Sequence, residues 1–264
     1  MKIDIFQIDA FTSSLFGGNP AAVCPLEHWL DDSILQKIAA ENNIAETAFF
    51  VKLSEGRFHL KWFTPQHEMD LCGHATLASA FVIFNELGYT GSKVTFESNS
   101  GELSVEREDD LLVLDFPSRP PEASTLPKII ADSFNIQPKE VLKSRDYVLV
   151  YEKEEDILNI QPNVSLLNEI NLDPGGIIVT AEGSDPDVDF VSRFFTPQAV
   201  VFEDPVTGSA HCSLIPFWAE RLQKTKLEAV QLSDRRGELS CELHGNRVKI
   251  KGRAVKYLQG MINM

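Results

Sequence analysis

Phe63-Thr64-Pro65-Gln66 recurs 132 positions later as Phe195-Thr196-Pro197-Gln198. Two further matches follow in the same order, at offsets of 135 and 136: Gly73-His74-Ala75 with Gly208-Ser209-Ala210, and Gly101-Glu102-Leu103-Ser104 with Gly237-Glu238-Leu239-Ser240. Chance does not readily produce three ordered matches, and this period is far longer than that of a solenoid repeat. The sequence therefore predicts two copies of one structural unit.

Each copy holds one apolar segment that is predicted to be a buried helix. Residues 75–84 carry no charged side chain on any face, so a helix there must be buried all round. Residues 210–219 are likewise uncharged apart from His211, and Pro216 should bend that helix or open its hydrogen-bond ladder. Each half therefore needs a layer wrapped around a central helix.

Strand-like segments supply that layer. Phe58, Leu60 and Trp62 alternate with His59 and Lys61, the period of a half-buried strand. Similar segments lie at 2–8, 48–53, 57–63, 93–97, 102–106 and 111–116, and an outer helix capped by Asp32 or Ser33 is expected over 32–42. The predicted class is α+β, with two pseudo-symmetric domains, each a barrel-like, mostly antiparallel sheet around a central helix.

Proline-rich residues 117–121 divide the two halves. We expect a first domain over 1–117 carrying the acid/base residues, a linker over 118–128 and a second domain over 129–264. The tail 253–264 has no counterpart in the first half, and packing on the first domain is one option for it.

The amino-acid composition and charge exclude some classes of function. The 264 residues are 43% hydrophobic and 24% charged, with a formal charge of −15, which is typical of a globular protein and argues against nucleic-acid binding. No secretory leader or membrane span is evident, so a cytoplasmic protein without a membrane partner is expected. Cys24, Cys72, Cys212 and Cys241 form no C-x-x-C pair, which indicates reduced thiols.

The two helix starts are the first candidate binding elements. Gly73-His74-Ala75-Thr76 and Thr207-Gly208-Ser209-Ala210 place small residues where unpaired amides can bind an anion. Two such sites facing each other suit a small metabolite with a carboxylate. The alternative is that these glycines only allow strand and helix to pack closely.

Candidate chemistry lies close to these starts. Glu46 sits between apolar stretches, where a partly desolvated carboxylate suits general acid/base work. His74 opens the first helix, whose positive dipole end favours a neutral imidazole. Asp204 could orient a substrate amine or hydroxyl, while Gly18 and Asn19 could floor a pocket. Taken singly, each also has a structural interpretation as a surface, turn or capping residue.

Several other chemistries are disfavoured. The chain has neither the G-x-G-x-x-G spacing of dinucleotide sites nor a phosphate-loop lysine, so no cofactor is expected. Cys72, His74, His211 and Cys212 match no familiar zinc spacing, and no metal is expected. A hydrolase triad of Ser209, His74 and Asp204 is also disfavoured, because Ser209 does not lie in the G-x-S-x-G motif that positions the nucleophile in such enzymes.

Four ordered motifs together resemble the PhzF-like (phenazine biosynthesis protein-like) family. They are Asp9-Ala10-Phe11-Thr12 with Gly17-Gly18-Asn19-Pro20, Ala45-Glu46-Thr47, Asp70-Leu71-Cys72-Gly73-His74-Ala75-Thr76, and Glu203-Asp204-Pro205-Val206-Thr207-Gly208-Ser209-Ala210. The resemblance implies a diaminopimelate-epimerase-like fold, a homodimer and a site in the cleft between the domains. It also implies cofactor-independent isomerisation, which in the best-understood member moves a proton on trans-2,3-dihydro-3-hydroxyanthranilate.

By this resemblance Glu46 is the general acid/base, and His74 and Asp204 orient and polarise the substrate. Ser209 and the helix starts with Gly73, Ala75, Thr207, Gly208 and Ala210 would bind a carboxylate or enolate. A two-thiol racemase is disfavoured, because Cys72 matches one catalytic cysteine but Thr207 replaces the other. The prediction is a proton-shifting isomerase; a noncatalytic metabolite-binding protein is the alternative, and a hydrolase is a weaker one.

Overall fold

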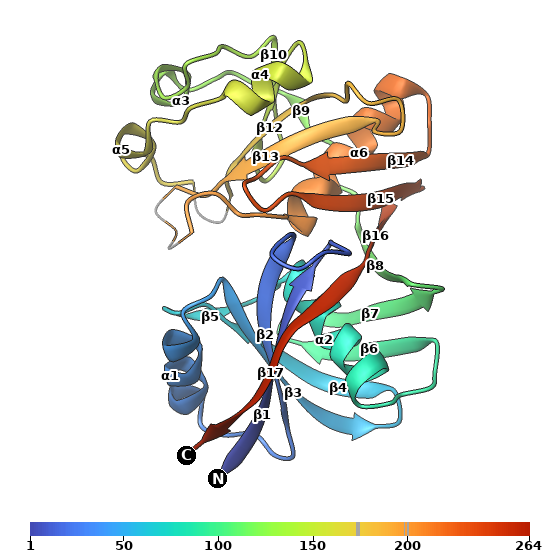
Figure 1. Ribbon diagram of the computed structural model, residues 1–264. Helices are drawn as coiled ribbons and strands as arrows, with labels where there is room; N and C mark the ends of the chain where they lie inside the picture. Colours follow the sequence, from blue (N-terminus) through green and yellow to red (C-terminus); the bar gives the residue numbers. More distant parts are fainter. Residues whose placement is uncertain (173–174, 198, 200) are drawn as a thin grey trace. The chain divides into compact units, whose positions relative to one another are not determined.

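The computed structural model describes residues 1–264 except 173, 174, 198 and 200, so Gln198 of the repeated motif lies outside the described residues. The chain forms two compact units (Figure 1): Met1–Asp115 with Lys251–Met264, and Phe116–Ile250. Each unit combines a mixed sheet with a central helix. The α+β class with sheet-wrapped helices predicted from the sequence is confirmed.

The strands of the first unit follow one another from edge to edge as β17, β1, β2, β3, β4, β6, β7 and β8, and the short β5 also pairs with β4. Their bounds are β1 Lys2–Ala10, β2 Asn19–Leu26, β3 Glu46–Ser54, β4 Arg57–Phe63, β5 Glu68–Met69, β6 Lys93–Ser98, β7 Gly101–Glu108, β8 Leu111–Pro117 and β17 Ala254–Asn263. The segments predicted as strands in this half are all found as strands.

Helix α2 (Gly73–Phe81) occupies the interior of the first unit and continues into the π-helical turn η1 (Val82–Glu86). Every residue from His74 to Ala80 is buried, as the absence of charge predicts. The helix contacts β1, β2 and β3 and also β7 and β17, so strands from both ends of the sheet surround it.

The outer helix α1 spans Asp32–Asn42, as predicted, but its cap differs. The N-cap is Asp31, not Asp32 or Ser33, and its side chain makes no capping bond. Its main-chain carbonyl instead accepts from the N–H groups of Ile34 and Leu35. Since Asp32 already has helical geometry, the cap falls one residue earlier than the sequence pattern indicates.

The second unit repeats the design with shorter extra elements. Its strands are β9 Glu122–Ala123, β10 Glu140–Lys143, β11 Tyr147–Val150, β12 Ile177–Glu182, β13 Phe190–Phe195, β14 Lys226–Gln231, β15 Gly237–His244 and β16 Arg247–Gly252. Its helices are α3 Lys128–Asp132, α4 Glu154–Asn159, α5 Val164–Leu167 and the central α6 Gly208–Leu222. Segment 118–128, expected to be a linker, thus contains β9 and the start of α3.

Strand pairing shows the duplication most directly. From β1 to β7 the pairs β1–β2, β2–β3, β3–β4, β4–β6 and β6–β7 alternate between antiparallel and parallel. The pairs β10–β11, β11–β12, β12–β13, β13–β14 and β14–β15 alternate in the same order. The first strand of each set also pairs with a further antiparallel strand, β17 on β1 and β9 on β10, so the C-terminal tail lies in the first unit.

Pro216 lies inside α6 and opens its hydrogen-bond ladder as expected. Proline has no N–H for the carbonyl four residues earlier, which belongs to Cys212. The N–H of Arg119 donates to that carbonyl at 2.9 Å and so anchors the chain segment that enters the second unit. Further along α6, the Trp218 ring stacks on Phe190 with centroids 5.8 Å apart.

All four cysteines are unpaired and buried. Within the described part of the chain, no helix combines the length and the apolar character needed to cross a bilayer.

Candidate active site

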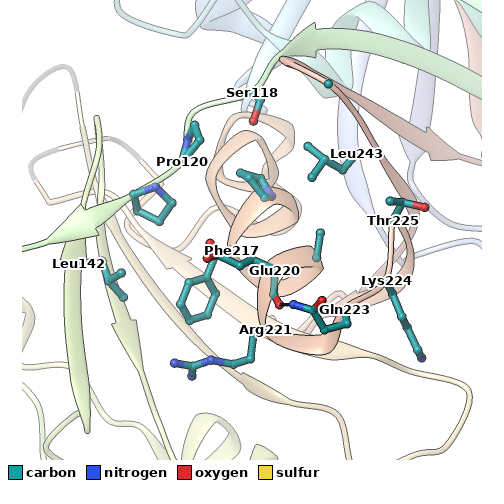
Figure 2. A pocket seen from close by; sticks show the side chains of 14 residues that line it. Ser118, Pro120, Leu142, Phe217, Glu220, Arg221, Gln223, Lys224, Thr225 and Leu243 are labelled. Carbon is teal, nitrogen blue, oxygen red and sulfur yellow. Dashed lines mark hydrogen bonds between the residues drawn. The ribbon is translucent and has the colours of Figure 1, made fainter.

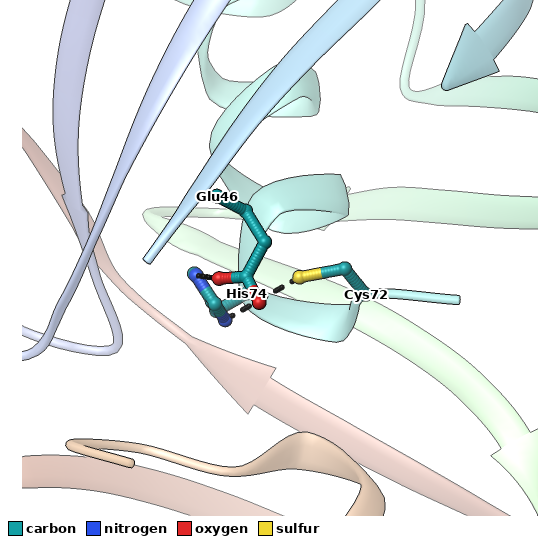
Figure 3. Close-up of side chains that lie close together, drawn as sticks. All are labelled: Glu46, Cys72 and His74. Atoms are coloured by element: carbon teal, nitrogen blue, oxygen red, sulfur yellow. Dashed lines mark hydrogen bonds and ion pairs between the residues drawn. The ribbon is translucent and has the colours of Figure 1, made fainter. Parts of the chain in front are cut away.

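Glu46 and His74 form a buried ion pair in the first unit. Glu46 is the first residue of β3, and His74 is the second residue of α2 (Figure 3). Glu46 Oε2 lies 3.0 Å from His74 Nε2, with side chains 15% and 6% exposed. Neither atom has a hydrogen-bond partner among the described residues, so the contact is close but not aligned as a hydrogen bond.

Backbone geometry brings a third side chain to this pair. Glu46 pairs with Ala21 of the parallel strand β2, which begins at Asn19. Asn19 Nδ2 lies 3.1 Å from His74 Nδ1, so the Asn19 amide lies against the imidazole ring. Gly18 makes the turn possible, since its φ is +62° and an added Cβ would lie 2.1 Å from the Ala10 carbonyl oxygen.

The surroundings of His74 favour its charged form. Burial acts to lower the pKa of His74, but the neighbouring Cys72 and Glu46 raise it, and the net direction is well above the usual value. This direction is opposite to the one that the helix dipole alone would give. A carboxylate in contact outweighs the partial charge of a helix end.

Cys72 completes this group but does not resemble a thiolate base. Burial and the charge of Glu46 raise the pKa of the Cys72 thiol, while His74 opposes this rise. Its Sγ lies 3.5 Å from His74 Nδ1, on the other ring nitrogen from the one that faces Glu46. At neutral pH the side chain is a protonated thiol.

The same three residues are of the types that ligate zinc, and their donor atoms lie within 4.8 Å of one another. However, Glu46 and Cys72 face different nitrogens of one imidazole. A single ion uses only one of these nitrogens, so the three donors do not converge on one point as they stand.

In the second unit Asp204 belongs to a hydrogen-bonded turn before α6. The Thr207 hydroxyl donates to Asp204 Oδ2 at 2.6 Å, and the Thr207 N–H donates to Gln231 Oε1 at 2.8 Å. The Gln231 amide in turn donates to the Asp204 carbonyl at 2.7 Å. Gln231 is fully buried and holds this turn rigidly.

Ser209 lies in the first turn of α6 and contacts a cation. Arg145 Nη2 donates to Ser209 Oγ at 2.9 Å, and the same guanidinium is paired with the buried carboxylate of Asp146 at 2.9 Å. The sequence therefore places Asp204 and Ser209 at one helix start, as predicted, but in separate hydrogen-bond networks.

Neither helix start is capped by a side chain. The N-caps, Cys72 and Thr207, are extended and make no side-chain capping bond. Gly73 and Ala75 follow the first cap, and Gly208 and Ala210 follow the second. Their main-chain amides are the ones that a bound carboxylate can reach.

A surface pocket in the second unit lies elsewhere. It has a volume of about 750 Å³ and lies along the C-terminal half of α6 (Figure 2). Pro120, Leu142 and Phe217 line it together with the exposed residues Glu220 and Arg221. None of the predicted site residues lines it, and it offers no buried acid or base.

Sequence reasoning missed Arg145, Asp146 and Gln231. The first two form a charged pair directly before the apolar run Tyr147-Val148-Leu149-Val150, which is the one local signal that could have drawn attention to them. Gln231 ends a strand and carries no such signal. Asn19 was predicted as a floor of the pocket, whereas its amide contacts His74.

Fold and site together define a protein of two units, each with a sheet around a central helix, in which a carboxylate–imidazole pair lies at the start of the first central helix. The family model for phenazine biosynthesis-like proteins (PhzC-PhzF) matches residues 8–260, and the chain belongs to this family.

Similar proteins agree with this assignment. An uncharacterized isomerase of Pseudomonas aeruginosa is 49% identical over the full length of both chains. The crystal structure of a PhzF family protein from Enterococcus faecalis matches all of both chains with a TM-score of 0.95 and 44% identity. A predicted epimerase from Pseudomonas aeruginosa shares the fold, with a TM-score of 0.77, 18% identity and 99% coverage of each chain.

Proposed function

We propose that this protein is a cofactor-independent isomerase that moves a proton on a small carboxylate-bearing metabolite. The observation that carries the proposal is the Glu46–His74 pair, which is buried, in contact at 3.0 Å and without hydrogen bonds at the two facing atoms. Buried polar atoms are ordinarily hydrogen-bonded. A substrate that supplies the missing partners accounts for this exception, and the isomerase names of relatives agree with it.

In this proposal Glu46 is the proton carrier. Its carboxylate takes a proton from one substrate carbon and returns it to another. His74 faces the carboxylate through Nε2 and donates to the oxygen or nitrogen that gains electron density, while the Asn19 amide lies against the other ring nitrogen. General acid/base catalysis of this kind supplies roughly 10²–10⁴-fold in rate.

The second unit is proposed to bind rather than to transfer protons. Ser209 and the amides after Thr207 would receive the carboxylate, and Asp204 would orient an amine or hydroxyl of the substrate. A two-base racemase is disfavoured because the Thr207 hydroxyl already donates to Asp204.

The test is solvent proton exchange. Wild-type protein and Glu46→Gln are incubated in heavy water with trans-2,3-dihydro-3-hydroxyanthranilate and a panel of small carboxylic acids, and deuterium in the product is followed by NMR. We expect the variant to lose roughly 10²–10⁴-fold in rate. Glu41→Gln, an exposed glutamate on α1, is the matched control.

Full proton exchange by a folded Glu46→Gln protein would contradict the assignment of Glu46 as the proton carrier. Tight binding of an acid by the wild type without any exchange would instead support the noncatalytic alternative.

A further inference from the structure

Arg145 is held unusually firmly for a partly exposed arginine. Its Nε and Nη2 donate to both carboxylate oxygens of Asp146 over 2.9–3.1 Å. The Asp146 carboxylate is 1% exposed and also accepts from the Gly176 N–H at 2.8 Å. A buried carboxylate is tolerated only when it is paired and hydrogen-bonded. Asp146 therefore has a fixed partner, and Arg145 has a fixed position.

This arrangement determines how the Ser209 hydroxyl must point. A guanidinium has donors and no acceptor, so Ser209 Oγ accepts the bond from Arg145 Nη2 at 2.9 Å. The hydroxyl proton is then free to donate to another group. Among the described residues none accepts it, so the donor is available to a ligand at the start of α6.

Arg145 and Arg119 both act on the Asp146 carboxylate, in a chain whose overall charge is −15. Asp146 neutralises one arginine, but Arg119 lies close by and its side chain makes no hydrogen bond or ion pair within the described ranges. Burial raises the pKa of Asp146, while the charges of Arg145 and Arg119 act to lower it. Two cations thus surround one carboxylate.

We propose that Arg145 is a specificity-determining positioning residue that turns the Ser209 hydroxyl toward a substrate carboxylate and, with Arg119, supplies the charge that distinguishes an acid from its neutral amide. This inference rests on the proposed function, since it names what binds the carboxylate. It assigns roles to Arg145 and Asp146 that the four family motifs do not contain.

The test compares two ligands that differ only in charge, anthranilate and anthranilamide, titrated by NMR into wild type and variants. Wild type is expected to bind anthranilate at least 10-fold more tightly than the amide. Arg145→Gln should remove at least 10-fold of this preference, and Arg145→Lys should restore part of it, because lysine keeps the charge but not the two-pronged geometry. Ser209→Ala, which leaves the Arg145–Asp146 pair intact, should also weaken the preference for anthranilate over the amide.

Arg221→Gln is the matched control. It removes the same charge from the same unit, but Arg221 pairs with Glu140 and lies 12 residues after Ser209 on α6, about 18 Å along the helix. Its preference for anthranilate should equal that of wild type. Unchanged discrimination in Arg145→Gln and Ser209→Ala overturns the proposal, and so does a wild type that does not prefer the acid.

Failure of this inference is distinguishable from failure of the proposed function. A protein that exchanges protons but does not prefer the acid through Arg145 keeps the isomerase assignment and loses this inference. A protein that prefers the acid through Arg145 but exchanges no protons retains the anion site and loses the isomerase assignment.

Discussion

The starts of α2 and α6 share a backbone design and differ in chemistry. Each begins with an extended cap and a glycine, and in each the fourth residue after the cap returns a side-chain bond to the cap carbonyl: Thr76 Oγ1 to Cys72 at 2.5 Å, and His211 Nδ1 to Thr207 at 2.8 Å.

The polar groups around the two starts are used differently. In the first unit the facing atoms of Glu46 and His74 have no hydrogen bonds, whereas Thr207 and Ser209 belong to hydrogen-bonded networks that hold them in place. Duplication therefore preserved the helix frame, and divergence changed the side chains that it presents. This difference suits proton transfer at the first start and ligand orientation at the second.

Among the variants that test this difference between the two helix starts, His74→Asn is expected to have the largest effect. The change removes the cation beside Glu46 and leaves a carboxylate buried without its charge partner. We expect the rate of solvent proton exchange to fall by roughly 10²–10⁴-fold. Circular dichroism and urea unfolding should show that the variant is folded.

The control for this variant is His67→Asn, which changes an exposed histidine of the same unit and should keep full activity. Activity within a few-fold of wild type in His74→Asn would show that the two helix starts do not differ in the way proposed.

A second, intermediate effect concerns pH, because the histidines of the two helices should respond in opposite directions. His211 is fully buried, and burial lowers its pKa from 6.5 to about 4. The stabilisation from its neutral form is present above pH 6.5 and is lost as the pH falls toward 4, by about 3 kcal/mol. The pKa of His74 is raised, so its contribution is present below pH 6.5 and is lost as the pH rises above neutrality.

Urea unfolding across pH 4–9 measures the contributions of both histidines to the free energy of unfolding. His211→Gln should flatten the acid side of the stability curve, and His74→Asn should flatten the alkaline side. If either variant leaves its side unchanged, the stated charge state of that histidine is wrong.

The sequence predicted those parts of the fold that depend on local pattern. The bounds of α1, the buried central helices and the strands of the first half follow from periodicity and from the absence of charge. Glu46 and His74 were found by motif, and the structure brings them into contact. The charge of His74 was not predictable, because it depends on the distance to a carboxylate 28 residues earlier. Arg145 was missed for the same reason, since its partner Ser209 lies 64 residues away.

The smallest effect is expected from Cys72→Ala, and it bears most directly on the ancestry of the site. The family resemblance aligns Cys72 with one base of a two-thiol epimerase, whereas burial and Glu46 raise the pKa of its thiol. A protonated thiol is no base at neutral pH, so exchange should stay within about threefold of wild type, well below the 10²-fold effect of a lost acid/base group. A 100-fold loss in the rate of proton exchange would instead show that Cys72 is a second acid/base group, as in a two-base racemase.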